Sequence, residues 1–491
     1  MLVLVNTNRM SPPIAPIGLD YIAACAQKAG IEVEILDLGL TDKPDKAMKD
    51  YFSMNNPELI GVTFRNADDC FWPSADWFVP NLKDTVENIR SLTNAPIVLG
   101  GIGFSIFART ILEYTGVDFG ICGDGEISTV ELVKQLRGSR NFANVPGLLW
   151  RDKNKVSRAS GPQMHGQDIH AAIIVENPPS WPDPVSLGTS RDFVDNKAYF
   201  KRGGQCGLET KRGCNRNCIY CADPLAKGTK LRLRNPSEVV DEIQSLLKQD
   251  INVLHICDSE FNLSRSHALE VCMEINRRSL GDKVRWYTYM SPSPFDAELA
   301  GQMAQAGCVG IDFTGDSACE SMLRTYNQTH SRNNLADGVK LCRENGMAVM
   351  IDLLLGGPGE TPQTVKETID FIKKINPDCV GATLGMRIYP RTAMEKYVTE
   401  QEQRGNLEAI RRKYTGPLNL LIPTFYISEQ LGEKPAELVK DFINGDRRFF
   451  EPAGEDSSDY NYNDNTPLIN AIQNGARGAF WHILNKLNQA S

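Results

Sequence analysis

The sequence predicts an α/β protein with a Rossmann-like domain at residues 1–150, a partial (β/α)6 barrel at 206–395 and a mostly helical C-terminal region at 396–491. Two observations lead to this prediction. In each of the first two parts, short β-rich runs alternate with amphipathic segments, which is typical of parallel sheets with crossover helices. The last part is polar and has mainly helical patterns. Residues 151–205, rich in proline and polar residues, are expected to form a linker.

The N-terminal sheet is expected to contain five strands, at 2–6, 33–38, 59–64, 96–101 and 117–123. Amphipathic segments lie between these runs and predict the covering helices. Ligands of open parallel sheets bind outside the carboxyl ends of the strands. The loops that begin at Phe64, Gly100 and Gly123 are therefore candidate binding loops.

The barrel is expected to contain six strands, at 208–213, 253–258, 284–290, 308–315, 348–357 and 381–389. Its chemistry should lie at the C-terminal strand ends, as in complete barrels. In the C-terminal region, Thr466 is expected to cap one last helix that begins at Pro467 and extends to Leu487.

The composition, with 41% hydrophobic and 23% charged residues, is that of a soluble globular protein. The net charge of −8 argues against a nucleic-acid partner. The sequence has no uninterrupted apolar run of about 18 residues, so we expect no membrane span. The 13 cysteines and the lack of a signal peptide predict a reducing, cytoplasmic location.

Three cysteines with C-x3-C-x2-C spacing, Cys214, Cys218 and Cys221, are the most specific feature of the chain. Three thiolates from one short loop can bind three irons of a [4Fe–4S] cluster. The fourth iron then stays open to a small ligand. A structural zinc site or a simple ferredoxin would need a fourth ligand, and none follows nearby.

This triad, with an aromatic residue just before its last cysteine, resembles that of the radical S-adenosylmethionine (SAM) superfamily. The resemblance implies that SAM binds the open iron and is cleaved to a 5′-deoxyadenosyl radical. It also implies roles for residues at the strand ends. Asp258-Ser-Glu260 stands where the family usually has a Gly-Gly-Glu motif for the SAM amino group, and it departs from that motif at its first two positions. The implied SAM-binding residues are Tyr220, Asp258, Glu260, Asp316, Gly356, Gly357, Gly359 and Arg387, the last facing either the SAM carboxylate or the substrate.

The order of a Rossmann-like domain before such a barrel resembles that of the cobalamin-binding branch of this superfamily. The segment that begins at Ser11-Pro-Pro also resembles that branch. No G-x-G-x-x-G motif follows the first strand, so a dinucleotide is disfavoured. Glycines at strand ends let a large ligand approach the backbone closely. The residues that the resemblance assigns to cobalamin are Phe64, Arg65, Asn66, Gly100, Gly101, Gly123, Gly125 and Glu126.

None of the six histidines lies in the first 164 residues. The Asp-x-His-x-x-Gly motif by which many cobalamin proteins ligate cobalt is absent. We therefore expect cobalamin without a histidine lower ligand, with its lower face near Phe64, Arg65 or Asn66.

The resemblance implies methylation of an unactivated carbon, or of phosphorus, in a small molecule, through methylcobalamin and the adenosyl radical. A flavodoxin or ferredoxin would supply electrons. Two alternatives stay open: a rearrangement or cyclisation without methyl transfer, and a non-enzymatic sensor or carrier.

Aromatic residues are the candidates for contact with the substrate. Trp72 and Trp77 are expected either to contact the corrin ring or to pack in the hydrophobic core. Tyr287 and Tyr289 alternate along the third barrel strand, where barrel filling is the competing interpretation. The full set of candidate substrate residues is Tyr287, Tyr289, Tyr389 and Tyr426.

Overall fold

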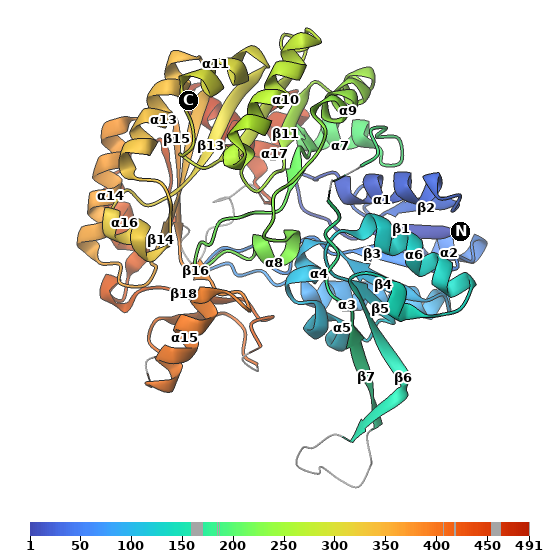
Figure 1. Cartoon of the computed structure of the whole chain (residues 1–491). Helices are drawn as coiled ribbons and strands as arrows, with labels where there is room; N and C mark the ends of the chain where they lie inside the picture. The colour runs from blue at the N-terminus through green and yellow to red at the C-terminus, as the bar shows by residue number, and fades with distance from the viewer. Residues whose placement is uncertain are drawn as a thin grey trace. The chain divides into compact units, whose positions relative to one another are not determined.

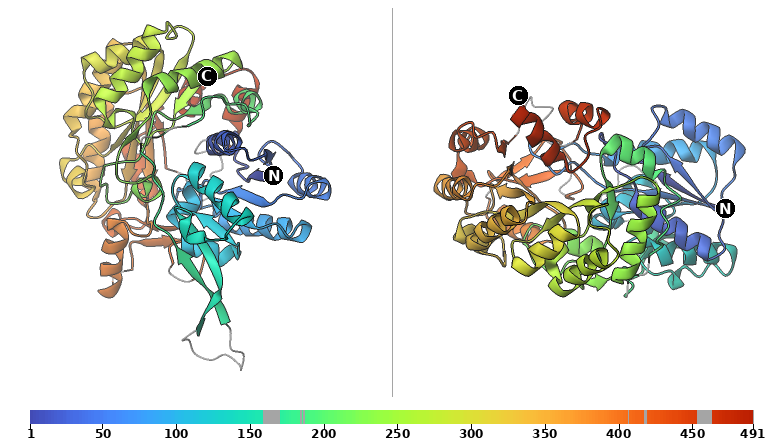
Figure 2. Two further views of the ribbon diagram at one scale, coloured as in Figure 1. Left: turned by 45° about the vertical axis from the view of Figure 1, so that its right-hand side comes forward. Right: turned by 90° about the horizontal axis from the view of Figure 1, so that it is seen from above.

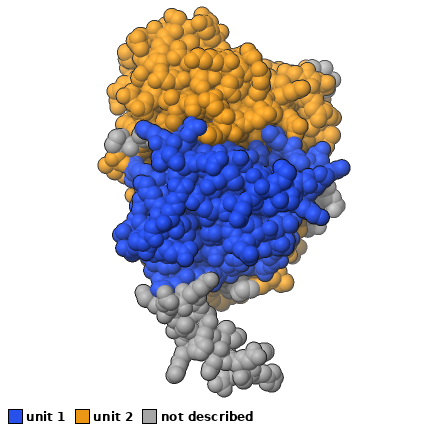
Figure 3. Space-filling model, turned by 90° about the vertical axis from the view of Figure 1, so that its right-hand side faces the viewer, with its two compact units in different colours: residues 1–8, 18–67, 78–182 blue, residues 9–17, 68–77, 183–491 orange. Residues whose placement is uncertain are grey.

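The chain folds into two units, and neither is one continuous stretch of sequence (Figure 3). Unit 1 comprises Met1–Asn8, Gly18–Ala67 and Phe78–Pro182, and unit 2 comprises Arg9–Ile17, Asp68–Trp77 and Asp183–Ser491. Two short N-terminal segments thus belong to the C-terminal unit. The computed structural model describes residues 1–158, 170–183, 185, 187–405, 407–416, 419–452 and 463–490.

Unit 1 is built on a seven-stranded sheet in the order β2-β1-β3-β4-β5-β6-β7 (Figure 1). The first five strands are parallel, which confirms the predicted open sheet. They are β1 (Leu2–Asn6), β2 (Val33–Asp37), β3 (Leu59–Thr63), β4 (Ile97–Gly100) and β5 (Phe119–Ile121). Their helices are α1 (Ile17–Lys28), α2 (Pro44–Met54), α3 (Val79–Leu92), α4 (Ile102–Ile106), α5 (Ala108–Thr115) and α6 (Gly125–Arg137). The strand order reverses between β1 and β3, where ligands of such sheets bind.

Much of the predicted linker has regular structure. After a 3₁₀ turn, η1 (Phe142–Asn144), the strands β6 (Leu148–Arg158) and β7 (His170–Glu176) pair antiparallel and extend the unit 1 sheet. Alternation is hard to detect here because the last seven residues of β6, DKNKVSR, are mostly polar. The rest of the predicted linker belongs to unit 2 and includes α7 (Asn196–Gly203).

Unit 2 contains six parallel barrel strands covered by helices (Figure 2), and β19 (Phe449–Phe450) pairs with the last of them. The six strands are β8 (Cys206–Leu208), β11 (Val253–Ile256), β12 (Arg285–Met290), β13 (Cys308–Asp316), β14 (Ala348–Leu355) and β15 (Cys379–Leu384). The first barrel strand lies mostly before the predicted range 208–213, because residues 211–212 pair in a separate two-stranded sheet. The surrounding helices are α9 (Pro236–Lys248), α10 (Arg265–Arg277), α11 (Ala297–Gln305), α12 (Glu320–Thr325), α13 (Arg332–Glu344) and α14 (Pro362–Ile375). Their apolar faces bury one continuous core against the outer face of the sheet.

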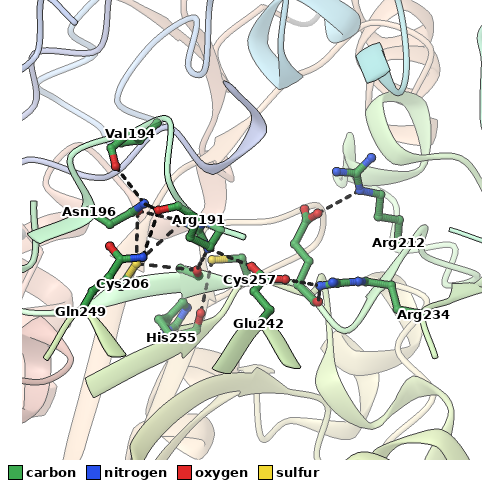
Figure 4. Close-up of polar contacts among 12 residues, drawn as sticks. Arg191, Val194, Asn196, Cys206, Arg212, Arg234, Glu242, Gln249, His255 and Cys257 are labelled. Carbon is green, nitrogen blue, oxygen red and sulfur yellow. Dashed lines mark hydrogen bonds and ion pairs between the residues drawn. The ribbon is translucent and has the colours of Figure 1, made fainter. Parts of the chain in front are cut away.

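Buried ion pairs join the segment before α7 to this barrel (Figure 4). Arg191 donates to Glu242 of α9 at 2.9 Å and to the Gly207 carbonyl of β8 at 2.9 Å. Arg234 also pairs with Glu242, at 2.8 Å, and none of these three charged side chains is exposed. Since an unpaired buried charge is costly, the network holds the segment before α7 against the barrel.

The C-terminal region combines helices with short strands. It contains α15 (Ala393–Gln403), α16 (Pro435–Ile443), η3 (Glu429–Leu431) and a small sheet of β16 (Met386–Arg387), β18 (Thr424–Tyr426) and β17 (Ile410–Arg412). No helix in the described part of the chain is long and apolar enough to cross a membrane.

The prediction of a single last helix is wrong in two respects. The structure has two helices, α17 (Thr466–Gln473) and α18 (Phe480–Ala490). Gly475 and Gly478 between them have φ angles of 98° and 140°, which are incompatible with a continuous helix. The cap is Asn465, whose side chain accepts from the Leu468 amide, rather than Thr466.

Helix α18 closes the amino-terminal end of the barrel. Trp481 packs in a buried cluster with Val253 and Cys379, the first residues of β11 and β15. Tyr287 belongs to the same cluster, and its hydroxyl lies 2.8 Å from Nδ1 of His482. The chemistry is therefore left to the opposite, carboxyl-terminal end of the strands.

Candidate active site

The three cysteines lie in a loop between two short paired strands, β9 (Lys211–Arg212) and β10 (Arg232–Leu233). The loop turns at Gly213, whose φ is +89° and where a Cβ atom would lie 2.1 Å from the Lys230 carbonyl oxygen. The Cys214 amide donates to the Gly228 carbonyl, and the Cys221 amide donates to the Cys218 carbonyl. Helix α8 (Asp223–Lys227) follows. The backbone thus requires glycine at position 213, directly before the first cysteine.

The thiols fit an iron–sulfur cluster. Burial raises the pKa of all three thiols, that of Cys218 to about 12, and a bound cation would favour their thiolate forms. Gln328 donates from Nε2 to the Cys218 sulfur at 3.4 Å. Among the described residues, no three His, Cys, Asp or Glu side chains are grouped to bind a single metal ion. A cluster does not need such a group, because each thiolate binds a different iron.

Glu260 has a buried carboxyl oxygen that lacks a donor. Its Oε1 accepts from Thr314 at 2.6 Å, whereas Oε2 has no hydrogen-bond partner among the described residues. Burial raises the pKa of Glu260 to about 8. Its charge also acts on Cys214 and Cys218, so the carboxyl lies near the thiols. This arrangement fits a cationic amino group beside the cysteine loop.

Asp316 lies at the end of β13, where the register with β14 shifts and its own φ is 54°. Its carboxylate accepts from the Tyr220 hydroxyl at 2.6 Å and from Gln328. Burial raises the pKa of Asp316 to about 7. Tyr220 and Asp316, 96 residues apart, are thus brought together as expected for neighbours in one site. Sequence analysis missed Gln328, which follows no strand end.

Asp258, by contrast, is occupied by the loop that leads into the cysteines. It accepts from the Thr210 amide at 2.8 Å and from Nζ of Lys211 at 2.7 Å, and both charged side chains are almost fully buried. This ion pair helps to hold the pKa of Asp258 below its usual value despite burial. Asp258 therefore positions the cysteine loop, and Glu260 is the better candidate to face SAM.

The glycine-rich loop after β14 is organised by Glu360. The Glu360 carboxylate accepts from the amides of Gly356, at 2.5 Å, and Gly357, at 3.2 Å, and from the Tyr326 hydroxyl. A Cβ atom at Gly357 would lie 2.2 Å from the Tyr326 ring. At Gly359 a Cβ atom would meet nothing within 4 Å, but its φ is +76°. Two of the three amides expected near SAM are thus already bonded within the loop.

Arg387 is paired within unit 2. It donates from Nε and Nη2 to Asp68 at 2.9 and 2.8 Å, and both side chains are buried. Asp68 begins the segment Asp68–Trp77, which the N-terminal sequence contributes to unit 2. Tyr389 stacks under the Arg387 guanidinium, and its hydroxyl lies 2.9 Å from the Cys70 sulfur. Both residues therefore secure this segment.

An aromatic pocket of about 150 Å³ lies inside unit 2. Tyr289 lines it, whereas Tyr287 lies in the cluster with α18 and Tyr426 packs beside Tyr397. Trp72 also lines it, and Trp77 packs against Tyr414, so both tryptophans belong to unit 2. The pocket is lined by Phe71, Trp72, Tyr289, Met350, Asp352, Gly381, Ala382, Thr383, Leu384, Phe450, Glu451, Pro452 and Phe480.

In unit 1, the expected cobalamin loops meet at the carboxyl ends of β3 and β4. The Phe64 amide donates to the Gly100 carbonyl, and the Gly103 amide donates to the Arg65 carbonyl. A Cβ atom at Gly101 would lie 2.5 Å from the Phe64 carbonyl oxygen. Phe64 is buried, Asn66 is partly buried and Arg65 is exposed.

The other glycines of unit 1 are explained in part by local packing. A Cβ atom at Gly123 would lie 2.6 Å from the Ser180 carbonyl oxygen, and one at Gly125 would lie 2.9 Å from Ile22. A Cβ atom at Gly100 would have its nearest neighbour, the Ile121 carbonyl oxygen, at 4.0 Å. Glu126 is buried in the first turn of α6. The space that we expected these glycines to leave for a ligand is thus clearest at Gly100.

Two family models match the chain, and each coincides with one of the two sheets. The B12 binding domain matches residues 4–133, and the radical SAM superfamily matches residues 208–372.

Among curated proteins, the chain is 33% identical to the tryptophan 2-C-methyltransferase of Streptomyces laurentii, over 82% of this chain and 74% of that protein. It is 23% identical to the cytidylyl-2-hydroxyethylphosphonate methyltransferase of Streptomyces wedmorensis, over 89% and 88%. Among solved structures, the radical SAM methyltransferase TsrM from Kitasatospora setae with tryptophan and a SAM analogue superposes with a TM-score of 0.88 and 30% identity, over 100% and 99%. The same enzyme has been solved with cobalamin and a [4Fe–4S] cluster bound.

Proposed function

This chain belongs to the cobalamin-dependent radical SAM methyltransferases, and we propose that its methyl acceptor is a ring carbon of an aromatic small molecule. The enzyme uses a [4Fe–4S] cluster, SAM and cobalamin. When bound, these groups supply electrons, the methyl group and the carrier that passes the methyl group on. The residues of the chain then bind, orient and shield the reacting molecules.

We assign the cofactor-binding roles to the residues whose geometry fits them. Cys214, Cys218 and Cys221 hold the cluster. The orphaned Oε2 of Glu260 receives the SAM amino group, and Asp316, held by Tyr220 and Gln328, receives the ribose hydroxyls. Asp258 and Arg387 are assigned to positioning rather than to contact with SAM, because each is already paired inside the protein.

The aromatic pocket is the observation that supports an aromatic acceptor. Its walls include Phe71, Trp72, Tyr289, Phe450 and Phe480, which suit the faces and edges of a flat ring. A cavity of about 150 Å³ accommodates a benzene-sized molecule in other proteins. Tryptophan, the substrate named for two of the relatives, has such a ring.

The test is an assay with SAM whose methyl group carries deuterium. The reconstituted enzyme is incubated without oxygen, with a reductant and with tryptophan, tryptamine, indole or phenylalanine. We expect the mass of at least one aromatic product to rise by one labelled methyl group, with fragmentation that places the label on a ring carbon. S-adenosylhomocysteine and 5′-deoxyadenosine are measured together.

Two outcomes would contradict the proposal. An altered product without label would favour the rearrangement or cyclisation. SAM that stays intact with every aromatic compound, while another class of small molecule is methylated, would exclude an aromatic acceptor. Glu260→Gln provides the matched loss-of-function control because it keeps the size of the side chain and removes its charge.

The remaining expectations concern the partners and the cobalt. We expect a flavodoxin or ferredoxin as electron donor and no nucleic-acid substrate. We also propose that the loop of Phe64, Arg65 and Asn66 faces the lower side of cobalamin without ligating cobalt through histidine, because no histidine occurs before His165.

A further inference from the structure

Two aspartates on neighbouring strands point into the barrel beside the aromatic pocket. In the parallel register, Asp312 of β13 lies opposite Tyr289 of β12 and opposite Met350 of β14. Tyr289 and Met350 both line the pocket, so Asp312 is on the same inner face of the sheet between them. Asp352, two residues after Met350, lines the pocket itself.

The two carboxyl groups differ in their access to the pocket. Asp312 is 3% exposed, and its Oδ1 has no hydrogen-bond partner within the described part of the chain. Asp352 keeps part of its surface accessible. Gly381 of β15 makes room for it, since a Cβ atom there would lie 2.2 Å from Oδ1 of Asp352. The strand next to Asp352 therefore has space for this carboxylate only because residue 381 lacks a side chain.

The surroundings of this acidic pair are negative. Burial, followed by the charges of Asp352 and Glu260, raises the pKa of Asp312. Burial and the charge of Asp316 raise the pKa of Asp352 to about 7. A cation in the pocket would offset this repulsion and would give the unpaired Asp312 oxygen a donor. A bound metal ion is disfavoured, because no third acidic, histidine or cysteine ligand is grouped with the pair among the described residues.

We propose that this pocket recognises a protonated amine on the aromatic substrate, with Asp352 and the unpartnered Asp312 holding the ammonium and Tyr289 and Trp72 flanking the ring. The inference rests on the proposed function, because it names the group by which that aromatic acceptor is held. Carboxylates and aromatic faces together are the environment in which proteins bind organic ammonium groups.

The competing possibility is that the pair keeps a proton and donates it to an anionic group of the substrate. A protonated aspartate is a hydrogen-bond donor, so it would favour a carboxylate on the ligand. The two possibilities predict opposite preferences between tryptamine, which has an amine and no carboxylate, and 3-indolepropionate, which has a carboxylate and no amine.

The test measures binding of both compounds to the reconstituted holoenzyme by calorimetry, for the wild type and for Asp352→Asn. We expect tryptamine to bind the wild type more tightly than 3-indolepropionate does. In Asp352→Asn, tryptamine affinity should fall by about tenfold to a hundredfold, while 3-indolepropionate affinity stays equal or rises. Asp370→Asn, the same change in an exposed ion pair on α14, should leave both affinities unchanged.

Gly381→Ala serves as a second variant that keeps both charges. Its methyl group must displace the Asp352 carboxylate, so tryptamine affinity should fall again. Iron content and the cobalamin absorption spectrum confirm that each variant is folded and loaded. Tighter binding of 3-indolepropionate, equal affinities in all variants, or no binding of tryptamine would each overturn the inference.

Binding and methyl transfer are scored separately. If tryptamine binds through Asp352 but no aromatic compound is methylated, the proposed function fails and the amine site stands. If an aromatic amine such as tryptamine is methylated with equal efficiency by wild type and Asp352→Asn, the proposed function stands and the amine site fails.

Discussion

At the scale of single residues, two charged pairs of unit 2 are buried. Arg387 with Asp68 and Lys211 with Asp258 are each almost fully buried. Breaking such a pair leaves a desolvated charge without compensation. The pair of Arg387 and Asp68 also anchors the segment that contributes Phe71 and Trp72 to the pocket.

We predict that Asp68→Ala destabilises unit 2 by about 3–5 kcal/mol, the range for loss of one partner of a buried ion pair. Hydrogen exchange of the amides in Asp68–Trp77 should become faster, and binding of aromatic ligands should weaken. Asp50→Ala, which breaks an exposed pair with Lys46 on α2, is the control and should have a much smaller effect. Equal effects of the two substitutions would refute the anchoring role.

At the scale of elements, α18 closes the amino-terminal end of the barrel through Trp481 and His482. The Tyr287 hydroxyl can donate to Nδ1 of His482 only while that imidazole is neutral. Burial, followed by the charge of Lys486, lowers the pKa of His482 to about 4. Folding therefore favours the neutral form of the His482 imidazole.

We predict that acid loosens this closure. Between pH 6.5 and about 4 the unfolded chain binds a proton at His482 that the folded chain excludes, so stability is present at neutral pH and falls as the pH falls. Thermal unfolding at pH 5 and pH 8 should show a smaller pH dependence for His482→Gln than for the wild type. His330, with a pKa also lowered to about 4 by burial, accounts for part of the dependence that remains. An unchanged pH dependence would show that His482 does not carry the effect.

At the scale of the whole molecule, each unit has its own sheet and its own match to a cofactor-binding family. The cysteine triad lies in unit 2, and the residues matched by the B12 binding domain fall mainly in unit 1. This division suggests that the two cofactors bind by separate sets of residues.

We predict that the triple variant Cys214→Ala, Cys218→Ala, Cys221→Ala loses its iron and sulfide but still binds cobalamin. Iron analysis and the cobalamin absorption of the gel-filtered protein measure the two properties independently. The wild type, reconstituted in parallel, gives the reference for both. A triple variant that elutes without cobalamin would show that the cluster is required for the cobalamin site.

Local patterns in the sequence were enough to predict the five parallel strands of unit 1, the β/α alternation of the barrel and the cysteine loop, but not β6 and β7. Alternation of β-rich and amphipathic segments depends on neighbouring residues, as does the spacing of Cys214, Cys218 and Cys221. The same local reasoning did not predict the break between α17 and α18, which depends on the positive φ angles of Gly475 and Gly478.

The tertiary structure alone decided which distant side chains meet. Arg387 pairs with Asp68, 319 residues away. Strand register puts Asp312 opposite Met350, two residues before Asp352 on the neighbouring strand. The N-terminal segment Asp68–Trp77 likewise becomes part of unit 2. A one-dimensional pattern specifies the faces and ends of elements. Which side chain becomes the partner of a buried charge depends on how those elements align in space. A buried charge without a partner is costly, so the fold must bring an oppositely charged group next to it.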